Sequence, residues 1–174
     1  INKNVKSIFD FTIDDFEFLY EIESDPEIIN YYHPNFDGKE VIEISSCDLS
    51  YKEYMEQDKK KIYIVHLEEE KIGTFSVTKD FECLVNEEKD NLAWISLAFN
   101  KKYFGKQVIK DSYFLFEELL RNSGYKKIEL GVFEFNKRAI KFYEKIGYKK
   151  ITSLKNFTYY TGKWWDDYRY EKNL

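Results

Sequence analysis

The hydrophobic and polar positions of the chain follow two periods, which predict strands and helices in a mixed order. Residues 92–99 are almost wholly apolar and predict a buried strand, whereas 62–67 and 72–77 alternate and predict a hairpin. The clearest helix is predicted over 108–122. Its apolar side chains recur at helical spacing: Val108, Ile109, Tyr113, Phe116, Leu119 and Leu120.

Capping and turn residues place the weaker elements. Thr12, followed by Asp14 and Asp15, is typical of a helix beginning. The other predicted elements are strands over 5–11, 127–132, 151–159 and 164–170 and helices over 16–23, 39–57 and 136–146, with a short helix beginning at Asp25-Pro26. No linker, repeat or low-complexity tract interrupts the chain. We therefore predict one domain over residues 1–174 with an α/β (α+β) fold, in which helices flank a mixed, mostly antiparallel sheet.

Composition narrows the classes of function. The 174 residues carry a net charge of −5, and 19% of them are aromatic, which disfavours disorder and provides a sizeable core. No basic stripe stands out, so nucleic-acid binding is disfavoured. No apolar run approaches the roughly 20 residues of a membrane span, and no signal peptide is evident. Cys47, Cys83, His33 and His66 are isolated from one another, so we expect no metal site and a cytoplasmic protein.

The segment between the predicted strand 92–99 and the long helix is a candidate anion site. Its loop, 103–107, leads directly into the helix. The first N–H groups of a helix have no intrahelical acceptor, and together with the helix dipole they favour an anion such as a pyrophosphate. Lys101, Lys102 and Lys106 add positive charge at the same place. From these residues alone, an ordinary strand-to-helix turn with solvated lysines stays open as the alternative.

A second motif follows the predicted strand 127–132. Residues 136–148 read Asn-x-x-Ala-Ile-x-Phe-Tyr-x-Lys-x-Gly-Tyr, which resembles the second coenzyme A motif of the GNAT N-acetyltransferase superfamily. The loop 103–109 resembles the first motif of that superfamily, Gln/Arg-x-x-Gly-x-Gly/Ala. The beginning at Asp25-Pro26-Glu27 and the ending over 159–170 resemble two of its branches, the ribosomal-protein N-terminal acetyltransferases and the spermidine N-acetyltransferases.

The resemblance implies acetyl-CoA as cofactor and assigns it a set of residues. Leu97 and Phe99 would lie on the strand that bonds the pantetheine arm, Asn136 would bond the pantetheine region, and Lys145 would lie near the cofactor. Tyr143 matches the residue that acts as general acid toward the leaving thiolate, although core packing is the alternative role. The pyrophosphate would be held by the loop and the first turn of the helix: Phe104, Gly105, Lys106, Gln107, Val108, Ile109 and Lys110.

The chain also departs from the family pattern. Gln107 stands where the family has its second glycine, and Ile109 stands where it has a small residue, so the cradle is expected to be reshaped. The carboxylate that the family often carries near the start of the buried strand is absent. Trp94 takes its place, with Ser96 two residues on. The base that deprotonates the amine is therefore another acid, such as Glu27, or a chain of waters.

The acceptor is expected to be an amine. Residues 14–27 contain seven acids and no Lys or Arg. The resemblance implies that the helices of this segment flank the acceptor groove, where an acidic wall would suit a polycationic amine; two solvated helix faces are the alternative. Glu27, Tyr31 and Tyr32 are the predicted acceptor residues.

The predicted reaction is direct transfer of acetyl from acetyl-CoA to a primary amine, either a small amine or polyamine or a protein N-terminus. A catalytically weak acyl-CoA-binding or sensing domain is the alternative. A third class, an interaction module, rests only on the aromatic strand pair around Trp164 and Trp165. A homo-oligomer is also compatible with the sequence.

Overall fold

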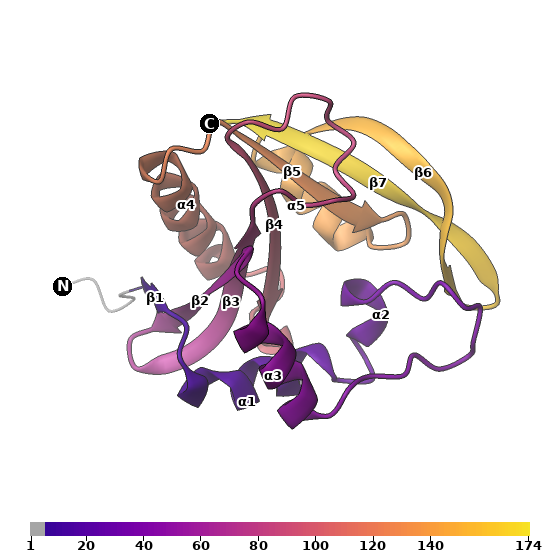
Figure 1. Ribbon diagram of the computed structural model, residues 1–174, viewed down its shortest axis with the longest axis horizontal. Coiled ribbons are helices and arrows are strands. Elements are labelled where there is room, and N and C mark those ends of the chain that lie inside the picture. The colour runs from indigo at the N-terminus through magenta and orange to yellow at the C-terminus, as the bar shows by residue number, and fades with distance from the viewer. Residues whose placement is uncertain (1–5) are drawn as a thin grey trace.

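The alternating and apolar runs of the chain become seven strands of one sheet in the computed structural model, which describes residues 6–174 (Figure 1). The strands are β1 (Lys6–Asp10), β2 (Lys60–Leu67), β3 (Glu70–Thr78), β4 (Leu92–Phe99), β5 (Lys127–Phe133), β6 (Lys149–Tyr160) and β7 (Lys163–Asn173). Their spatial order is β1-β2-β3-β4-β5-β7-β6. Every neighbouring pair is antiparallel except β4 and β5, which confirms the mixed, mostly antiparallel sheet.

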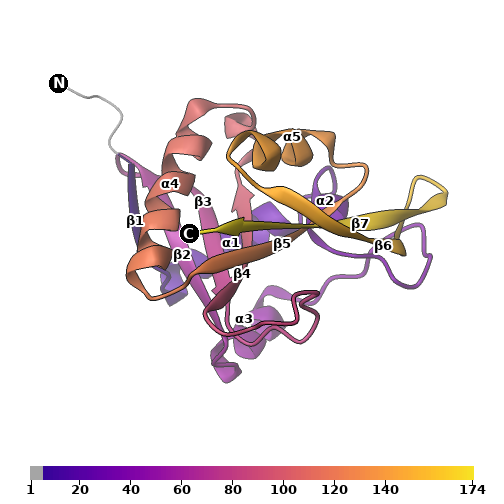
Figure 2. The same cartoon turned by 90° about the horizontal axis from the view of Figure 1, so that it is seen from above.

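Helices cover both faces of this sheet (Figure 2). They are α1 (Phe16–Glu23), α2 (Ile29–Tyr32), α3 (Cys47–Glu56), α4 (Gln107–Asn122) and α5 (Lys137–Lys145). The helices α4 and α5 pack on one face, where Phe116 stacks on Phe75 with ring centroids 4.6 Å apart. On the other face, α1 packs Leu19 and Ile22 against β2 and β4. Each such buried apolar side chain stabilises the fold by about 1.5–3 kcal/mol.

Two predicted helices differ from the structure. The helix predicted over 39–57 begins only at Cys47, because Ser46 is its N-cap and accepts the N–H of Leu49 at 3.2 Å. The short helix predicted from Pro26 begins at Ile29. The preceding residues form a turn around Asp25, whose carbonyl accepts the N–H of Ile29 at 2.8 Å. Of the strand predicted over 5–11, residue 5 lies outside the described residues.

The sheet opens between β4 and β5. Pairing between these parallel strands runs from Leu92 opposite Lys127 to Trp94 opposite Glu129 and then stops. Beyond this point β4 stays paired with β3 as far as Phe99, and β5 stays paired with β7. The facing edges of β4 and β5 therefore diverge, and their backbone groups are available inside the opening. In the described part of the chain, no helix is long and apolar enough to cross a membrane.

Candidate active site

The edge of β4 offers backbone hydrogen-bonding groups inside the opening. The N–H of Phe99 donates to the hydroxyl of Tyr32 at 3.4 Å rather than to a neighbouring strand. Because the N–H groups of alternate strand residues point the same way, the N–H of Leu97 also faces the opening, where β5 no longer pairs with β4. Such an edge can bond the amide groups of an extended ligand as a further strand would. The structure therefore brings Leu97 and Phe99, both predicted at the cofactor, to one edge.

The loop after β4 leaves N–H groups free at the beginning of α4. Gly105 has a φ of +75°, and no atom lies within 4 Å of the position that a Cβ would take, so the backbone conformation is what requires glycine. Among the described residues, the N–H groups of Gly105, Gln107 and Val108 have no hydrogen-bond acceptor, whereas that of Ile109 donates to the carbonyl of Lys106 at 3.2 Å. Free donors at the positive end of a 16-residue helix favour an anion.

A groove of about 530 Å³ lies at this end of α4, and three lysines line it. Lys6 pairs with Asp111 at 3.2 Å, and Lys102 pairs with Glu70. Within the described residues Lys106 has no ion pair, so its charge is uncompensated. The Glu70 carboxylate holds the pKa of Lys102 above its ordinary value. Beside the free N–H groups at the beginning of α4, the groove therefore carries one lysine without an ion-pair partner among the described residues.

The residues that depart from the glycine-rich pattern are engaged within the protein. The side chain of Gln107 donates from Nε2 to Oδ1 of Asp111 at 3.0 Å, which holds it along the first turn of α4. Ile109 is 8% exposed and packs in the core beside Tyr113. Lys110, on the same turn, is half-buried. The N–H groups of Gln107 and Val108 thus remain without an acceptor among the described residues, although Gln107 and Ile109 replace the glycine and the small residue of the family pattern.

The two cofactor motifs meet at the beginnings of α4 and α5. The guanidinium of Arg138, in the first turn of α5, lies 5.1 Å from the ring centroid of Phe104, in the loop before α4. Asn136 is the N-cap of α5, and its Oδ1 accepts the N–H of Ala139 at 3.3 Å, which leaves its amide N–H₂ without a partner among the described residues. Lys145 is exposed at the other end of α5, about 13 Å along the helix axis. The sequence analysis did not predict this contact between Arg138 and Phe104, which links the two motifs.

Two tyrosines reach the opening from opposite faces of the sheet. Tyr143 comes from α5, and Tyr32 comes from α2. Burial raises the pKa of Tyr32 to about 12, and burial together with the nearby Tyr32 raises the pKa of Tyr143 well above its ordinary value. The Tyr143 hydroxyl has no partner among the described residues. The one fully enclosed and unpaired polar side-chain atom there is Nδ1 of His66, so the Tyr143 hydroxyl is not completely enclosed, although the residue is buried. A phenol that stays protonated beside the opening can donate a proton.

The other predicted acceptor residues lie nearer the surface. The side chain of Glu27 is 72% exposed and pairs with Lys101 at 2.6 Å. Tyr31 is 38% exposed and packs edge-on against Phe135 with ring centroids 5.5 Å apart. Of the three predicted acceptor residues, Tyr32 is the one that contacts the edge of β4.

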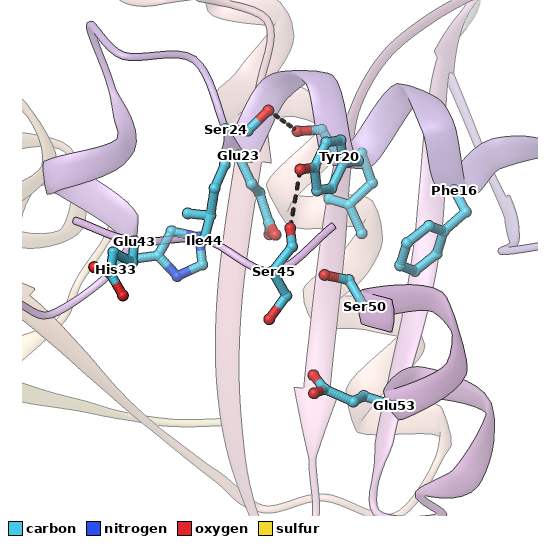
Figure 3. A pocket seen from close by; sticks show the side chains of 11 residues that line it. Phe16, Tyr20, Glu23, Ser24, His33, Glu43, Ile44, Ser45, Ser50 and Glu53 are labelled. Atoms are coloured by element: carbon cyan, nitrogen blue, oxygen red, sulfur yellow. Dashed lines mark hydrogen bonds between the residues drawn. The ribbon is translucent and has the colours of Figure 1, made fainter. Parts of the chain in front are cut away.

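An acidic pocket of about 250 Å³ lies between α1, α3 and the segment 43–45 (Figure 3). Its rim carries Glu23, Glu43 and Glu53 together with His33, and none of its lining residues is Lys or Arg. The hydroxyl of Tyr20 donates to the carbonyl of Ser45 at 2.9 Å and so fixes one wall. The pocket thus has a negative lining.

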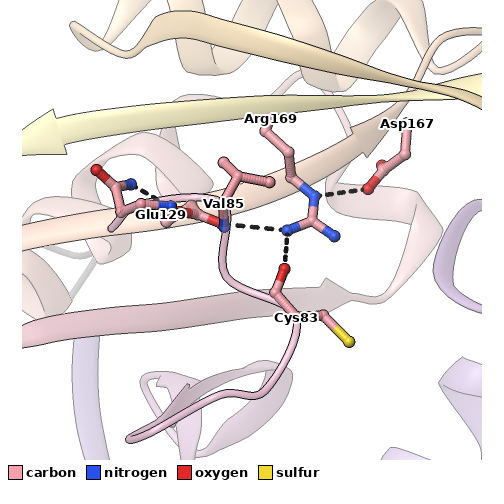
Figure 4. Close-up of polar contacts among 6 residues, drawn as sticks. Cys83, Val85, Glu129, Asp167 and Arg169 are labelled. Atoms are coloured by element: carbon pink, nitrogen blue, oxygen red, sulfur yellow. Dashed lines mark hydrogen bonds and ion pairs between the residues drawn. The ribbon is translucent and has the colours of Figure 1, made fainter. Parts of the chain in front are cut away.

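A buried charge cluster lies where β4 and β5 separate (Figure 4). Arg169 of β7 donates from Nε to Oδ2 of Asp167 at 2.9 Å and from Nη1 to Oε2 of Glu129 at 3.1 Å. All three side chains are at most 4% exposed. The guanidinium also lies over the ring of Trp94, 4.8 Å from its centroid. Sequence reasoning missed this cluster, although the period of a strand places Asp167 and Arg169 on one face.

Comparison with known proteins identifies the class to which this fold and site belong. A family model described as "Acetyltransferase (GNAT) domain" matches residues 12–168. The chain therefore belongs to the GNAT acetyltransferase family. No curated protein matches it.

Solved structures show the same fold at low sequence identity. A domain from Methanocaldococcus jannaschii is 24% identical with a TM-score of 0.73, and the match covers 98% of this chain and 99% of that one. A spermidine N-acetyltransferase from Vibrio cholerae in complex with CoA and spermine is 16% identical with a TM-score of 0.73, over 97% and 95%. A ribosomal-protein-alanine N-acetyltransferase from Brucella melitensis is 16% identical with a TM-score of 0.74, over 97% and 99%.

Proposed function

We propose that this GNAT protein transfers the acetyl group of acetyl-CoA to a primary amine. One observation carries the proposal: the unpaired edge of β4 leads, within one loop, to the free N–H groups at the beginning of α4. A strand edge that bonds amides, next to a helix N-terminus that binds phosphates, suits a ligand with a peptide-like arm and a pyrophosphate. Coenzyme A has both parts.

The residues present fit this cofactor. Leu97 would bond the arm from its backbone, Asn136 would donate from its side-chain amide, and the segment 104–110 with Lys106 would hold the pyrophosphate. Acetyl-CoA would supply an acetyl group activated as a thioester. The protein then aligns an amine against the acetyl carbonyl, and Tyr143 gives its proton to the leaving sulfur.

The acceptor site is proposed on the face that carries α1, α2 and α3. Tyr32 contacts the edge of β4 there, with Glu27 and Tyr31 farther out. The pocket lined by three glutamates on the same side favours a cationic amine. Two of the similar structures have names that suggest acceptors, since one contains spermine and the other is named a ribosomal-protein-alanine N-acetyltransferase. Polyamines and peptide N-termini are therefore the first acceptors to test.

A catalytically weak acyl-CoA-binding domain is the second candidate. The observation that favours it is Trp94, which occupies the position where the family often has a carboxylate. Such a domain would bind acetyl-CoA and release no thiol in the presence of amines.

Two measurements on one preparation separate these functions. Acetyl-CoA at 100 times its dissociation constant should stabilise the protein by about 2.7 kcal/mol, which appears as a higher melting temperature. Thiol release is then followed with a panel of monoamines, polyamines and peptides, and mass spectrometry identifies the acetylated product. Stabilisation with turnover supports the enzyme, stabilisation without turnover supports the binding domain, and no stabilisation contradicts both.

A further inference from the structure

The sheet is open to solvent beside the point where β4 and β5 separate. Ser96 lies in the central strand β4, where side chains are normally covered, and yet it is exposed. Trp94 precedes it on the same face, and its indole stacks between Phe81, 4.4 Å away, and Arg169. This face of β4 is therefore accessible to solvent at Ser96, whose hydroxyl hydrogen-bonds that of Ser76 on β3.

Asp167 reaches this place from β7. The two carboxylate oxygens of Asp167 and the ring of Trp94 pack directly over Gly131 of β5. A Cβ at Gly131 would lie 2.9 Å and 3.1 Å from Oδ2 and Oδ1 and 3.1 Å from Cη2 of Trp94. Asp167 thus lies beside the tryptophan that occupies the carboxylate position of the family.

The two carboxylates of the buried cluster are bonded differently. Glu129 is saturated, because its oxygens accept from Val85, Asn86 and Arg169. Asp167 accepts a single bond, from Arg169 to Oδ2, and its Oδ1 has no partner among the described residues. Since Nδ1 of His66 is the one fully enclosed, unpaired polar side-chain atom in that part of the chain, Oδ1 of Asp167 keeps some solvent-accessible area, although the side chain as a whole is only 4% exposed. Only Asp167 therefore has an oxygen available for a reaction.

We propose that Asp167 is the catalytic base of the acetyl transfer, an assignment that rests on the proposed function. As the lone pair of the neutral amine forms the C–N bond, the nitrogen gives a proton to Oδ1 of Asp167. The C–S bond breaks, its electron pair stays on sulfur, and the proton of Tyr143 goes to that sulfur. Asp167 then loses its proton to solvent, and Tyr143 regains one, so the charges balance.

Burial and the charges around Asp167 set the direction in which its pKa is shifted. Burial raises its pKa above the ordinary 3.8; Arg169 on its own strand opposes the rise, and Glu129 on β5 adds to it. The other elements packed around it contribute the uncharged Trp94 from β4 and Leu154 from β6. A base must be ionised, so turnover should fall as the pH drops through the raised pKa.

The test compares Asp167→Asn with Asp166→Asn. Asp166 is the matched control, because it is adjacent in sequence but bonds Ser153 and Lys155 instead of the cluster. With an amine that the wild type acetylates, Asp167→Asn should lower kcat/KM by on the order of 100- to 10,000-fold at pH 7. It should also abolish the acidic limb of the pH profile, after correction for ionisation of the amine itself. Asp166→Asn should keep both the rate and the limb, and acetyl-CoA affinity should persist in both variants.

Four results would overturn the assignment. If Asp167→Asn retains wild-type kcat/KM, or loses rate while the acidic limb persists, Asp167 has only a structural role. If Asp167→Asn does not fold, the test uses the wild-type protein alone. The midpoint of the acidic limb in its pH–rate profile must then equal the pKa of the Asp167 carboxyl group measured by NMR titration. A mismatch rejects Asp167 as the base. If the wild type acetylates none of the amines, the proposed function is rejected together with the assignment of the base. Failure of the base assignment alone is recognised because the wild type is then active.

Discussion

The replacement Tyr143→Phe removes only the hydroxyl group and keeps the ring, so it tests the catalytic role of Tyr143 separately from its role in packing. The Tyr143 hydroxyl donates to no group among the described residues, so its removal breaks no intramolecular hydrogen bond. A typical intramolecular hydrogen bond contributes about 0.5–1.5 kcal/mol to the free energy of unfolding, and this loss is therefore avoided. The ring remains to pack against Tyr148, with centroids 5.4 Å apart. A general acid contributes on the order of 100- to 10,000-fold, and at 1.36 kcal/mol per tenfold this equals about 2.7–5.4 kcal/mol of activation free energy. We therefore expect a large loss of kcat with almost unchanged stability and cofactor affinity.

Steady-state thiol release at saturating acetyl-CoA measures kcat, calorimetry measures the cofactor affinity, and urea unfolding measures stability. The matched control is Tyr148→Phe, whose hydroxyl bonds that of Tyr113 at 2.8 Å in the core. That control should lose stability and keep kcat. A Tyr143→Phe variant with wild-type kcat would refute the reasoning and return Tyr143 to a packing role.

Three further predictions concern the loop and the capping residues. Gly105→Ala forces alanine into a positive φ, which costs roughly 1–2 kcal/mol in urea unfolding; an unchanged stability would contradict the strain argument. Gln107→Gly should keep or tighten acetyl-CoA binding in calorimetry, because the N–H groups remain, and lost binding in a folded variant would make the side chain a contact. Burial alone would raise the pKa of Asp15, but its bonds with Lys71 and Thr12 hold that pKa below the ordinary value. The stabilisation is thus present at neutral pH and is lost as the pH falls through this lowered pKa, so Asp15→Asn should destabilise at pH 7, and its difference from the wild type should shrink as the solution is acidified.

The local sequence pattern was sufficient to predict the helices and strands that have a strong hydrophobic period or a capping residue. The apolar run 92–99 and the helix ending at Asn122 appear as predicted, because period and capping agree there. The first part of the predicted helix, 39–46, is absent, because tertiary contacts decide the course of this segment. The side chain of Asn35 donates to the carbonyl of Lys39 at 2.6 Å, and the backbone N–H of Asn35 donates to the hydroxyl of Thr158 on β6 at 2.8 Å. Such bonds across 123 residues leave no local signal.

Part of the candidate site could likewise be predicted from local sequence, and part could not. The loop before α4 and the Asn136 motif are contiguous in sequence and could be recognised. The pairing of Arg138 with Phe104 and the approach of Asp167 to Trp94 join distant segments, so they depend on how β4, β5 and β7 are ordered. Trp94 was recognised as a departure from the pattern, but the carboxylate beside it became visible only in three dimensions.

Amide-resolved hydrogen exchange with and without acetyl-CoA tests the central claim most directly, because the claim places the cofactor on named N–H groups. Binding between β4 and the beginning of α4 should slow exchange at Leu97, Gln107 and Val108, whose N–H groups have no acceptor within residues 6–174. Amides on α3, at the far side of the sheet, should keep their rates. Protection confined to other segments, or no protection at saturating acetyl-CoA, would contradict the account.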